Sequence, residues 1–235
     1  MTLAIAKMLV WSALTILSYA IALAAYRRGN AHPFLIPVAT GAGLIMMLIK
    51  VLGESYPGYA QATGLLRSLI GPATVALALP LFAQLERLRS VWRALSATLI
   101  LGCAAAIASA VALGWALGAG ASLVSSLAPK SATMPIAMPV AVQVGGQAPI
   151  AALAVAITGV AGAIFSDPLL RWMRIRDPRV RGFSVGLTAH AIGLAREMQH
   201  SPVAGGFAAL AMCLNAGATA AMVPIAWRIA AHWLA

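Results

Sequence analysis

Lys130, Ser131 and Thr133 form the group of residues in this sequence whose types and spacing best suit binding chemistry. Lys130 is the only charged residue in positions 94–166, with 36 uncharged residues on either side. An ammonium group in so apolar a stretch costs about 2.5–3.5 kcal/mol to insert into a bilayer unless it is paired or faces a wet cavity. A cation, two hydroxyls and the N–H groups at the start of a helix could together hold a carboxylate, and Ser131 is placed to cap that helix. The alternative is that Lys130 extends to the membrane surface and binds lipid headgroups.

Thr74, His190 and Asn215 are three further candidates for substrate contact. Thr74 lies in "GPATVALALP", where its hydroxyl could re-satisfy carbonyls that the prolines free; a simple kinked packing helix is the alternative. His190 has an unperturbed pKa of about 6.5, which suits proton coupling, although a lone histidine in a helix is more often a hydrogen-bond partner. Its spacing places His190 on one helix face with Gly193 and Arg196. Asn215 is an intramembrane amide that either contacts substrate or bridges helices.

The sequence contains no recognisable enzyme constellation, so we expect that the protein is not an enzyme. All the acidic residues stand at the edges of apolar segments, and we therefore expect neither a buried carboxylate pair nor a catalytic triad. In particular, Arg196 and Glu197 are expected to mark a membrane edge. Neither a Walker-type phosphate loop nor a Cys-x-x-Cys or Cys/His spacing occurs, so no cofactor or metal site is predicted. The acidic residues are Glu54, Glu86, Asp167, Asp177 and Glu197.

The elements that must position these residues belong to a membrane protein. The chain is 62% hydrophobic and 9% charged, with a mean hydropathy of +0.92, whereas soluble domains carry about 25% charged residues. We expect one all-α, polytopic membrane domain over residues 1–235. The net charge of +11 comes from basic residues between the apolar runs, which set orientation and meet anionic lipid, so no nucleic-acid partner is expected. About six to eight membrane elements are predicted, and apolar runs suggest eight, at 3–25, 33–49, 65–85, 94–117, 119–147, 148–166, 182–195 and 203–227.

Three basic clusters constrain how these elements cross the membrane. They lie at 27–28, 87–93 and 171–181, and the positive-inside rule requires all three on the cytoplasmic side. Since three elements separate the last two clusters, 119–147 is predicted to be a re-entrant hairpin with Lys130 near its tip and beside a cavity. The alternative is a spanning helix broken at Pro129. A weak echo between 74–87 and 184–197 suggests an inverted repeat, and such repeats place broken helices at a transporter's midplane site.

The chain resembles the LrgB/CidB family of bacterial membrane proteins, a family that also forms the C-terminal half of the plastid glycolate/glycerate translocator. The resemblance extends from about residue 30 to the end, and Met134 and Leu194 depart from the usual pattern. It rests on the stretches "GPATVALALPLF" (71–82), "SLAPKSATMPIAMPV" (126–140), "ITGVAGAIF" (157–165), "RIRDPRVRGFSVGLTAHAIGLARE" (174–197) and "AALAMCLNA" (208–216).

The resemblance implies two functions in a bacterial inner membrane. One is transport of small 2-hydroxy or 2-oxo acids such as glycolate, glycerate or pyruvate, for which we expect His190 to be the candidate for proton coupling. The other is antiholin-like modulation of murein hydrolases and autolysis with a smaller LrgA/CidA-type membrane partner. Residue chemistry favours transport, because a buried cation, hydroxyls and broken helices describe an anion site. A homo-oligomer is also expected.

Overall fold

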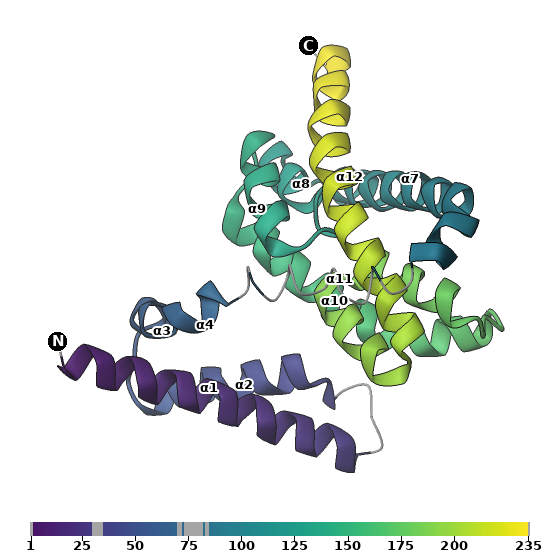
Figure 1. The fold of residues 1–235 in the computed structure, drawn as a ribbon. Helices are drawn as coiled ribbons and strands as arrows, with labels where there is room; N and C mark the ends of the chain where they lie inside the picture. The colour runs from purple at the N-terminus through teal and green to yellow at the C-terminus, as the bar shows by residue number, and fades with distance from the viewer. Residues whose placement is uncertain (1, 30–34, 70–71, 73–81, 83–84, 235) are drawn as a thin grey trace. The chain divides into compact units, whose positions relative to one another are not determined.

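The computed structural model describes residues 2–29, 35–69, 72, 82 and 85–234, and every regular element among them is a helix (Figure 1). This confirms the predicted all-α class. The chain forms two compact units, Met1–Ala78 and Leu79–Ala235, which are described separately. The interpretation of residues 1–235 as one membrane domain stays a prediction. Thr74, most of the predicted element 65–85 and most of the 74–87 half of the proposed repeat lie outside the described residues.

The first unit is a small group of helices built on a long apolar one. α1 packs against α2, and α2 and α3 meet at a bend of 115°, as a broken span or a re-entrant loop would. Trp11 of α1 packs edge-on against Tyr59 of α3 with ring centroids 5.4 Å apart, and Lys7 forms a 2.7 Å ion pair with Glu54. The elements are α1 (Thr2–Arg28), α2 (Pro37–Val51), α3 (Tyr56–Ala62) and α4 (Gly64–Ser68).

The second unit contains three long apolar helices and the shorter helices between them. Together with α1, these three make four described helices that are long and apolar enough to cross a membrane, or five with the bent α2–α3 pair. The protein is therefore a multi-pass membrane protein. The long helices are α7 (Leu85–Ala116), α10 (Ala148–Trp172) and α12 (Pro202–Leu234), and between them lie α8 (Ala121–Leu127), α9 (Met134–Gln143) and α11 (Pro178–His200).

Residues 121–147, here named the first hairpin, fold back on themselves as the re-entrant interpretation requires. The Gln147 N–H donates to Ser126 Oγ at 2.7 Å, and the Gln147 side chain donates to Ser122 Oγ at 3.3 Å. Gly146 is needed at this closure, because a Cβ there would lie 2.7 Å from the Ser126 nitrogen. Both ends of the segment thus lie side by side, with Lys130 in the turn between α8 and α9.

The α11 segment is a second hairpin rather than the single short element predicted at 182–195. At His190 the backbone has φ 40° and ψ −130°, which is not helical. The chain reverses there, so that Arg181 of the first arm reaches Glu197 of the second, with an Arg181 Nε to Glu197 Oε2 distance of 2.6 Å. Gly193 lets the arms approach, since a Cβ there would lie 2.7 Å from Val185. The proposed single helix face for His190, Gly193 and Arg196 is therefore wrong.

The two hairpins enter the second unit from opposite ends. α7 and α12 run in the same direction. Near the start of both helices, Val91 of α7 packs against the cluster that contains Phe183 of α11 and Phe207 of α12. Farther along both helices, Cys103 Sγ lies 3.6 Å from Thr219 Oγ1. α10 runs the other way, from the open end of the first hairpin to the base of the second. One end of the unit, named the basic end, therefore carries both Arg93 and the arginines of 171–181, as the positive-inside argument expected.

Small residues bring the second hairpin against α12. A Cβ on Gly182 would clash with the Ala204 carbonyl, and a Cβ on Gly186 would clash with the Ala208 carbonyl. This is the spacing of four by which small residues pack membrane helices closely. The first arm of the hairpin and the start of α12 are thus fixed side by side and in the same direction.

If the first hairpin enters from the non-cytoplasmic face, both of its ends react with an impermeant thiol reagent added outside. We expect this for single cysteines at Ala121 and Gln143 in a chain lacking Cys103 and Cys213, because both positions are exposed at the open end. Gln143 serves better than Gly145, whose φ of 84° disfavours a side chain. Labelling of the two positions from opposite faces would show instead a spanning, broken helix.

Candidate functional site

Asn215 lies where the two hairpins meet. This α12 residue is 1% exposed, and its amide nitrogen donates to the Ser131 carbonyl at 2.7 Å and the Leu187 carbonyl at 3.2 Å. Ser131 belongs to the turn of the first hairpin, and Leu187 lies just before the reversal of the second. The Leu187 carbonyl is among the last in its helical arm, and such terminal carbonyls lack a hydrogen-bond partner within the helix. One side chain thus satisfies a backbone group from each hairpin, so Asn215 bridges helices as one of its two predicted roles required.

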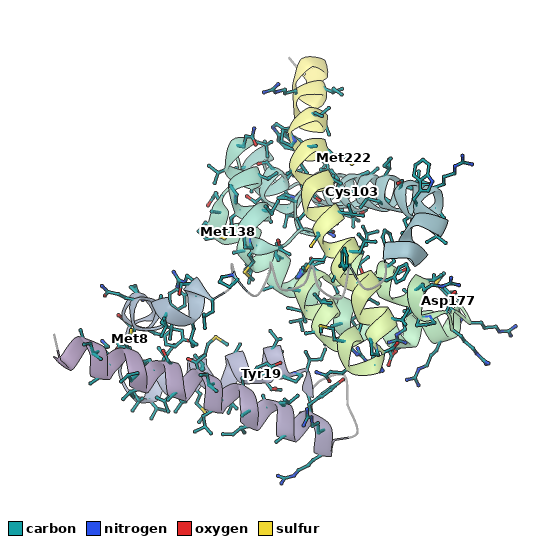
Figure 2. All side chains as sticks on the ribbon, in the orientation of Figure 1. Met8, Tyr19, Cys103, Met138, Asp177 and Met222 are labelled. Atoms are coloured by element: carbon teal, nitrogen blue, oxygen red, sulfur yellow. The ribbon has the colours of Figure 1, made fainter. Side chains whose placement is uncertain are left out.

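A short polar chain continues from this junction to α7. Thr219 donates to Asn215 Oδ1 at 3.5 Å, and its hydroxyl lies 3.6 Å from Cys103 Sγ. Cys103 also packs in an apolar cluster with Val140 of α9 and Val223 of α12, near Met222 (Figure 2). The junction is therefore tied to α7 and α12 on one side while its surroundings stay apolar.

His190 forms the tip of the second hairpin and rests on α10. Its Nε2 lies 3.0 Å from the Val155 carbonyl, and the residue is 3% exposed. Gly159 makes room for the ring, because a Cβ there would clash with His190 Cε1. Val155 also packs with Ala132, from the turn of the first hairpin. The tips of both hairpins therefore converge on the middle of α10 as well as on Asn215.

The predicted Lys130, Ser131 and Thr133 lie together in the turn of the first hairpin. Lys130 and Thr133 are half-buried and Ser131 is 7% exposed. Among the side chains that the structure describes, Lys130 takes part in no ion pair. The cap of α9 is Thr133 rather than Ser131, and its side chain makes no capping hydrogen bond. The prediction of Ser131 as the cap was wrong because the turn extends two residues farther before the helix begins.

Each hairpin tip joins the C-terminal end of one helix, which carries partial negative charge, to the N-terminal end of the next, which carries partial positive charge. α9 starts just after the first turn, and the second arm of α11 starts just after His190, so both helix N-termini lie at the tips. In α9, Pro135 has no N–H and Ile136 donates to the Thr133 carbonyl at 3.0 Å, which leaves the Met134 N–H at the helix start. The partial positive charge of such N-termini favours anions. Two helix N-termini therefore lie beside the turn that carries Lys130, a combination that suits an anion, whereas both amide hydrogens of Asn215 are already donated to backbone carbonyls.

Four charged residues at the base of the second hairpin form a buried ion network that the sequence interpretation missed. Arg181 makes a two-point contact with Glu197, at 2.6 and 2.9 Å, and also pairs with Asp167. Arg196 Nη2 lies 3.1 Å from Asp167 Oδ2. Glu197 is 0%, Arg196 6% and Asp167 7% exposed. The expectation of no buried carboxylate pair was therefore wrong, because the reversal at His190 folds Glu197 inward and Arg181 pairs with both Glu197 and Asp167.

A signal for this network was present in the sequence. Asp167 falls within the same long helix as the apolar run 148–166, so an opposite charge had to be near it. Glu197 is 16 residues from Arg181 in the sequence, which is too far for the two side chains to meet on a single straight helix. Only the assumption of a hairpin in this segment would have paired them.

Asp177 starts the second hairpin and lies among the arginines of the basic end (Figure 2). Its side chain accepts the Arg179 N–H at 2.8 Å and contacts the Arg179 guanidinium, and these contacts lower the pKa of Asp177 to about 2. A carboxyl with a lowered pKa stabilises the fold above its unfolded pKa of about 3.9, and this contribution is lost as pH falls toward 2. Asp177 is ionised throughout pH 5–8 and cannot cause a pH dependence there.

Comparison with known proteins identifies the family. The model of the LrgB-like family matches residues 15–229. The chain belongs to the LrgB-like family. Two relatives of this LrgB-like chain are named for a function: the antiholin-like protein LrgB of Bacillus subtilis (strain 168) is 23% identical over 80% of this chain and 82% of its own, and the holin-like protein CidB of Staphylococcus aureus (strain Mu50) is 24% identical over 83% and 85%.

A third relative, YxaC of Bacillus subtilis, is 32% identical over 86% of the LrgB-like chain and 88% of its own length. No solved structure matches the chain. The family resemblance inferred from the sequence is thus confirmed. The names of the relatives support the antiholin-like alternative more directly than they support carboxylate transport.

Replacing Asn215 by Ala should lower the thermal stability of this LrgB-like protein in detergent. The change leaves two buried carbonyls without a donor, at a cost of about 1–3 kcal/mol for each, which corresponds to several degrees in the unfolding temperature. Cys213→Ala is the matched control, because Cys213 is on the same helix and exposed. Equal unfolding temperatures for the two variants, followed by tryptophan fluorescence, would contradict the bridging role of Asn215.

Proposed function

We propose that this protein is a secondary carrier of small carboxylates. The observation that supports this most is the meeting of two oppositely entering hairpins at Asn215. Broken helices whose ends face a common midplane point are the usual construction of a secondary transporter's binding site. A purely structural membrane protein gains nothing from placing Lys130 and interrupted helices at this depth, since each costs free energy.

The chemistry of the region fits a 2-hydroxy or 2-oxo acid such as glycolate, glycerate or pyruvate. The Lys130 ammonium and the Met134 N–H at the positive end of α9 match a carboxylate. The hydroxyls of Ser131 and Thr133 match a neighbouring hydroxyl or keto oxygen. Both residues precede the first turn of α9, so the two sets of groups face the same helix end. A small acid is favoured because the neighbouring Ala132, Ala137 and Val155 are buried and packed against one another, which leaves little room for a larger one.

Transport through this site requires the two hairpins to open separately. Each tip is held at the junction by neutral hydrogen bonds, which cost little to break compared with buried ion pairs. Displacing the first hairpin would expose the junction to one face of the membrane, and displacing the second would expose it to the other. Alternating access around a fixed site follows from this arrangement.

A second candidate function is antiholin-like or holin-like modulation of autolysis. It is supported by the names of LrgB and CidB, to which the chain is similar over most of its length. In this function the chain acts with an LrgA/CidA-type membrane partner or as a homo-oligomer. The two functions are compatible if altered export of acid changes murein hydrolase activity indirectly.

Lys130→Met should abolish uptake of labelled glycolate, pyruvate and lactate by proteoliposomes that contain only this chain. The variant should still fold, because loss of the ammonium also removes the cost of burying it. Lys130→Arg should retain part of the activity, since the charge remains and its geometry changes. Wild-type uptake by folded Lys130→Met protein would exclude this residue from the site.

The same variant distinguishes the two functions in cells. If autolysis depends on transport, Lys130→Met changes the lysis rate as strongly as deletion of the protein. If the chain acts by binding a membrane partner, Lys130→Met leaves lysis as in the wild type although uptake is lost. Absence of uptake by the wild-type chain in proteoliposomes, together with a clear lysis phenotype, would favour the antiholin-like function.

His190→Gln should change the pH dependence of uptake more than the apparent affinity for substrate. Cotransport of one proton makes the movement of a monovalent acid electroneutral, and His190, which lies at a tip, has an unperturbed pKa within the working range. Glutamine can still donate to the Val155 carbonyl, so the local structure is kept. The measurement is the initial rate from about pH 5 to 8, a range that brackets the imidazole pKa. An unchanged profile would leave His190 as a hydrogen-bonding residue only.

A further inference from the structure

The ion network of Asp167, Arg181, Arg196 and Glu197 holds the second hairpin at its base. Arg181 stands in the first arm, Glu197 in the second and Asp167 in α10, so the Arg181 guanidinium contacts carboxylates from two other segments. Its side chain is 16% exposed and that of Glu197 is 0% exposed. Asp167 also contacts both arms, through Arg181 and Arg196, so the same three segments meet at this network.

The network is positioned to control the geometry of the tip. The reversal at His190 has a positive φ, which is unfavourable for a residue with a side chain and persists only where the surroundings hold it. At the tip itself the holding contacts are neutral hydrogen bonds to Val155 and Asn215. The charged contacts all lie at the other end of the two arms. Closure of the base therefore determines how closely the arms approach.

We propose that Arg181 is a positioning residue that sets the location of His190 and the Leu187 carbonyl in the site. This inference rests on the proposed carrier function for its consequence in transport, but its structural part is testable without transport. The planar guanidinium can bind Glu197 by two parallel hydrogen bonds while it contacts Asp167, which the point charge of lysine cannot do. Arg181 thus fixes both the separation of the two arms and their position along the axis of α10.

The test measures how often the tip opens, by thiol labelling of two buried alanines. Ala189 is next to His190 and Ala141 lies in α9 of the first hairpin, and both are 0% exposed. Each is changed singly to Cys in a chain lacking Cys103 and Cys213, and the labelling rate with a membrane-permeant reagent is measured in proteoliposomes. The rates are compared in the presence of Arg181→Gln and of Arg171→Gln. Arg171 is the matched control, because it also pairs with Asp167 but its side chain is 78% exposed.

Arg181→Gln should raise the labelling rate at Ala189→Cys by about tenfold or more, since local opening exposes the tip, while Ala141→Cys is unaffected. Arg171→Gln should leave both rates unchanged. Equal acceleration at both sites would mean general unfolding, and no acceleration at Ala189→Cys would mean that the base does not control the tip. Either result would overturn the proposal.

A double variant keeps the test valid if Arg181→Gln does not fold. Removing Arg181 alone leaves the Glu197 carboxylate buried without its partner, which is strongly destabilising. Arg181→Gln with Glu197→Gln removes both charges and should fold, but it should still show fast labelling at Ala189→Cys because the two-point contact is lost. Arg181→Lys, which keeps the charge, should give an intermediate rate. A wild-type rate in the double variant would show that the network only balances charge.

Transport by the same proteoliposomes then tests the functional consequence. The double variant should raise the KM for the carboxylate more than it lowers the maximal rate, because the substrate-facing groups remain but are misplaced. If wild-type protein shows no uptake while Ala189→Cys still responds to Arg181→Gln, the carrier function fails and the positioning role stands. If uptake is present and the labelling does not respond, the positioning role fails alone.

Discussion

The second unit depends on one constraint: backbone polar groups at membrane depth need partners, because the bilayer core offers no water. Two chain reversals free such groups at the tips of the hairpins, and the Asn215 amide donates to one carbonyl from each. Its position in α12 therefore fixes where the hairpins must end. A hydrophobic residue at position 215 would leave both carbonyls without donors and would destabilise the packing of the helices that carry the hairpins.

The two hairpins satisfy the same constraint by different means at their open ends. The first is closed by serine hydroxyls and the backbone and side chain of Gln147, and the second by arginine–carboxylate pairs. The difference follows the charge distribution, because the arginines gather at the basic end and require counter-ions wherever they are buried. Breaking neutral hydrogen bonds costs less than separating buried ions. The first hairpin is accordingly the more easily displaced of the two.

Sequence reasoning predicted which polar residues lie close together better than it described the structure around them. The isolated charge of Lys130 and the intramembrane positions of His190 and Asn215 were visible in the composition, and the structure brings their segments together. The reversal at His190 was not predictable from periodicity, because no glycine or proline marks that residue. Without the reversal, Glu197 is assigned to the edge of a segment, and its ion pair with Arg181 cannot be predicted. Thr74 lies outside the described residues, so its role in the site stays a prediction.

The geometry bears on which of the two functions uses the junction itself. At the tips, Ala132, Ala137 and Val155 are almost completely buried and pack against one another, so the described tips are closely packed. A lesion-forming or partner-binding activity would have to use the outward helix faces, where large apolar side chains such as Leu101, Leu113 and Ile157 are exposed. The half-buried Lys130 and the buried, strained His190 lie at the tips instead. Carrier activity is the function for which the costly interior residues have a direct use, whereas antiholin-like action draws on a surface that any member of a membrane assembly presents.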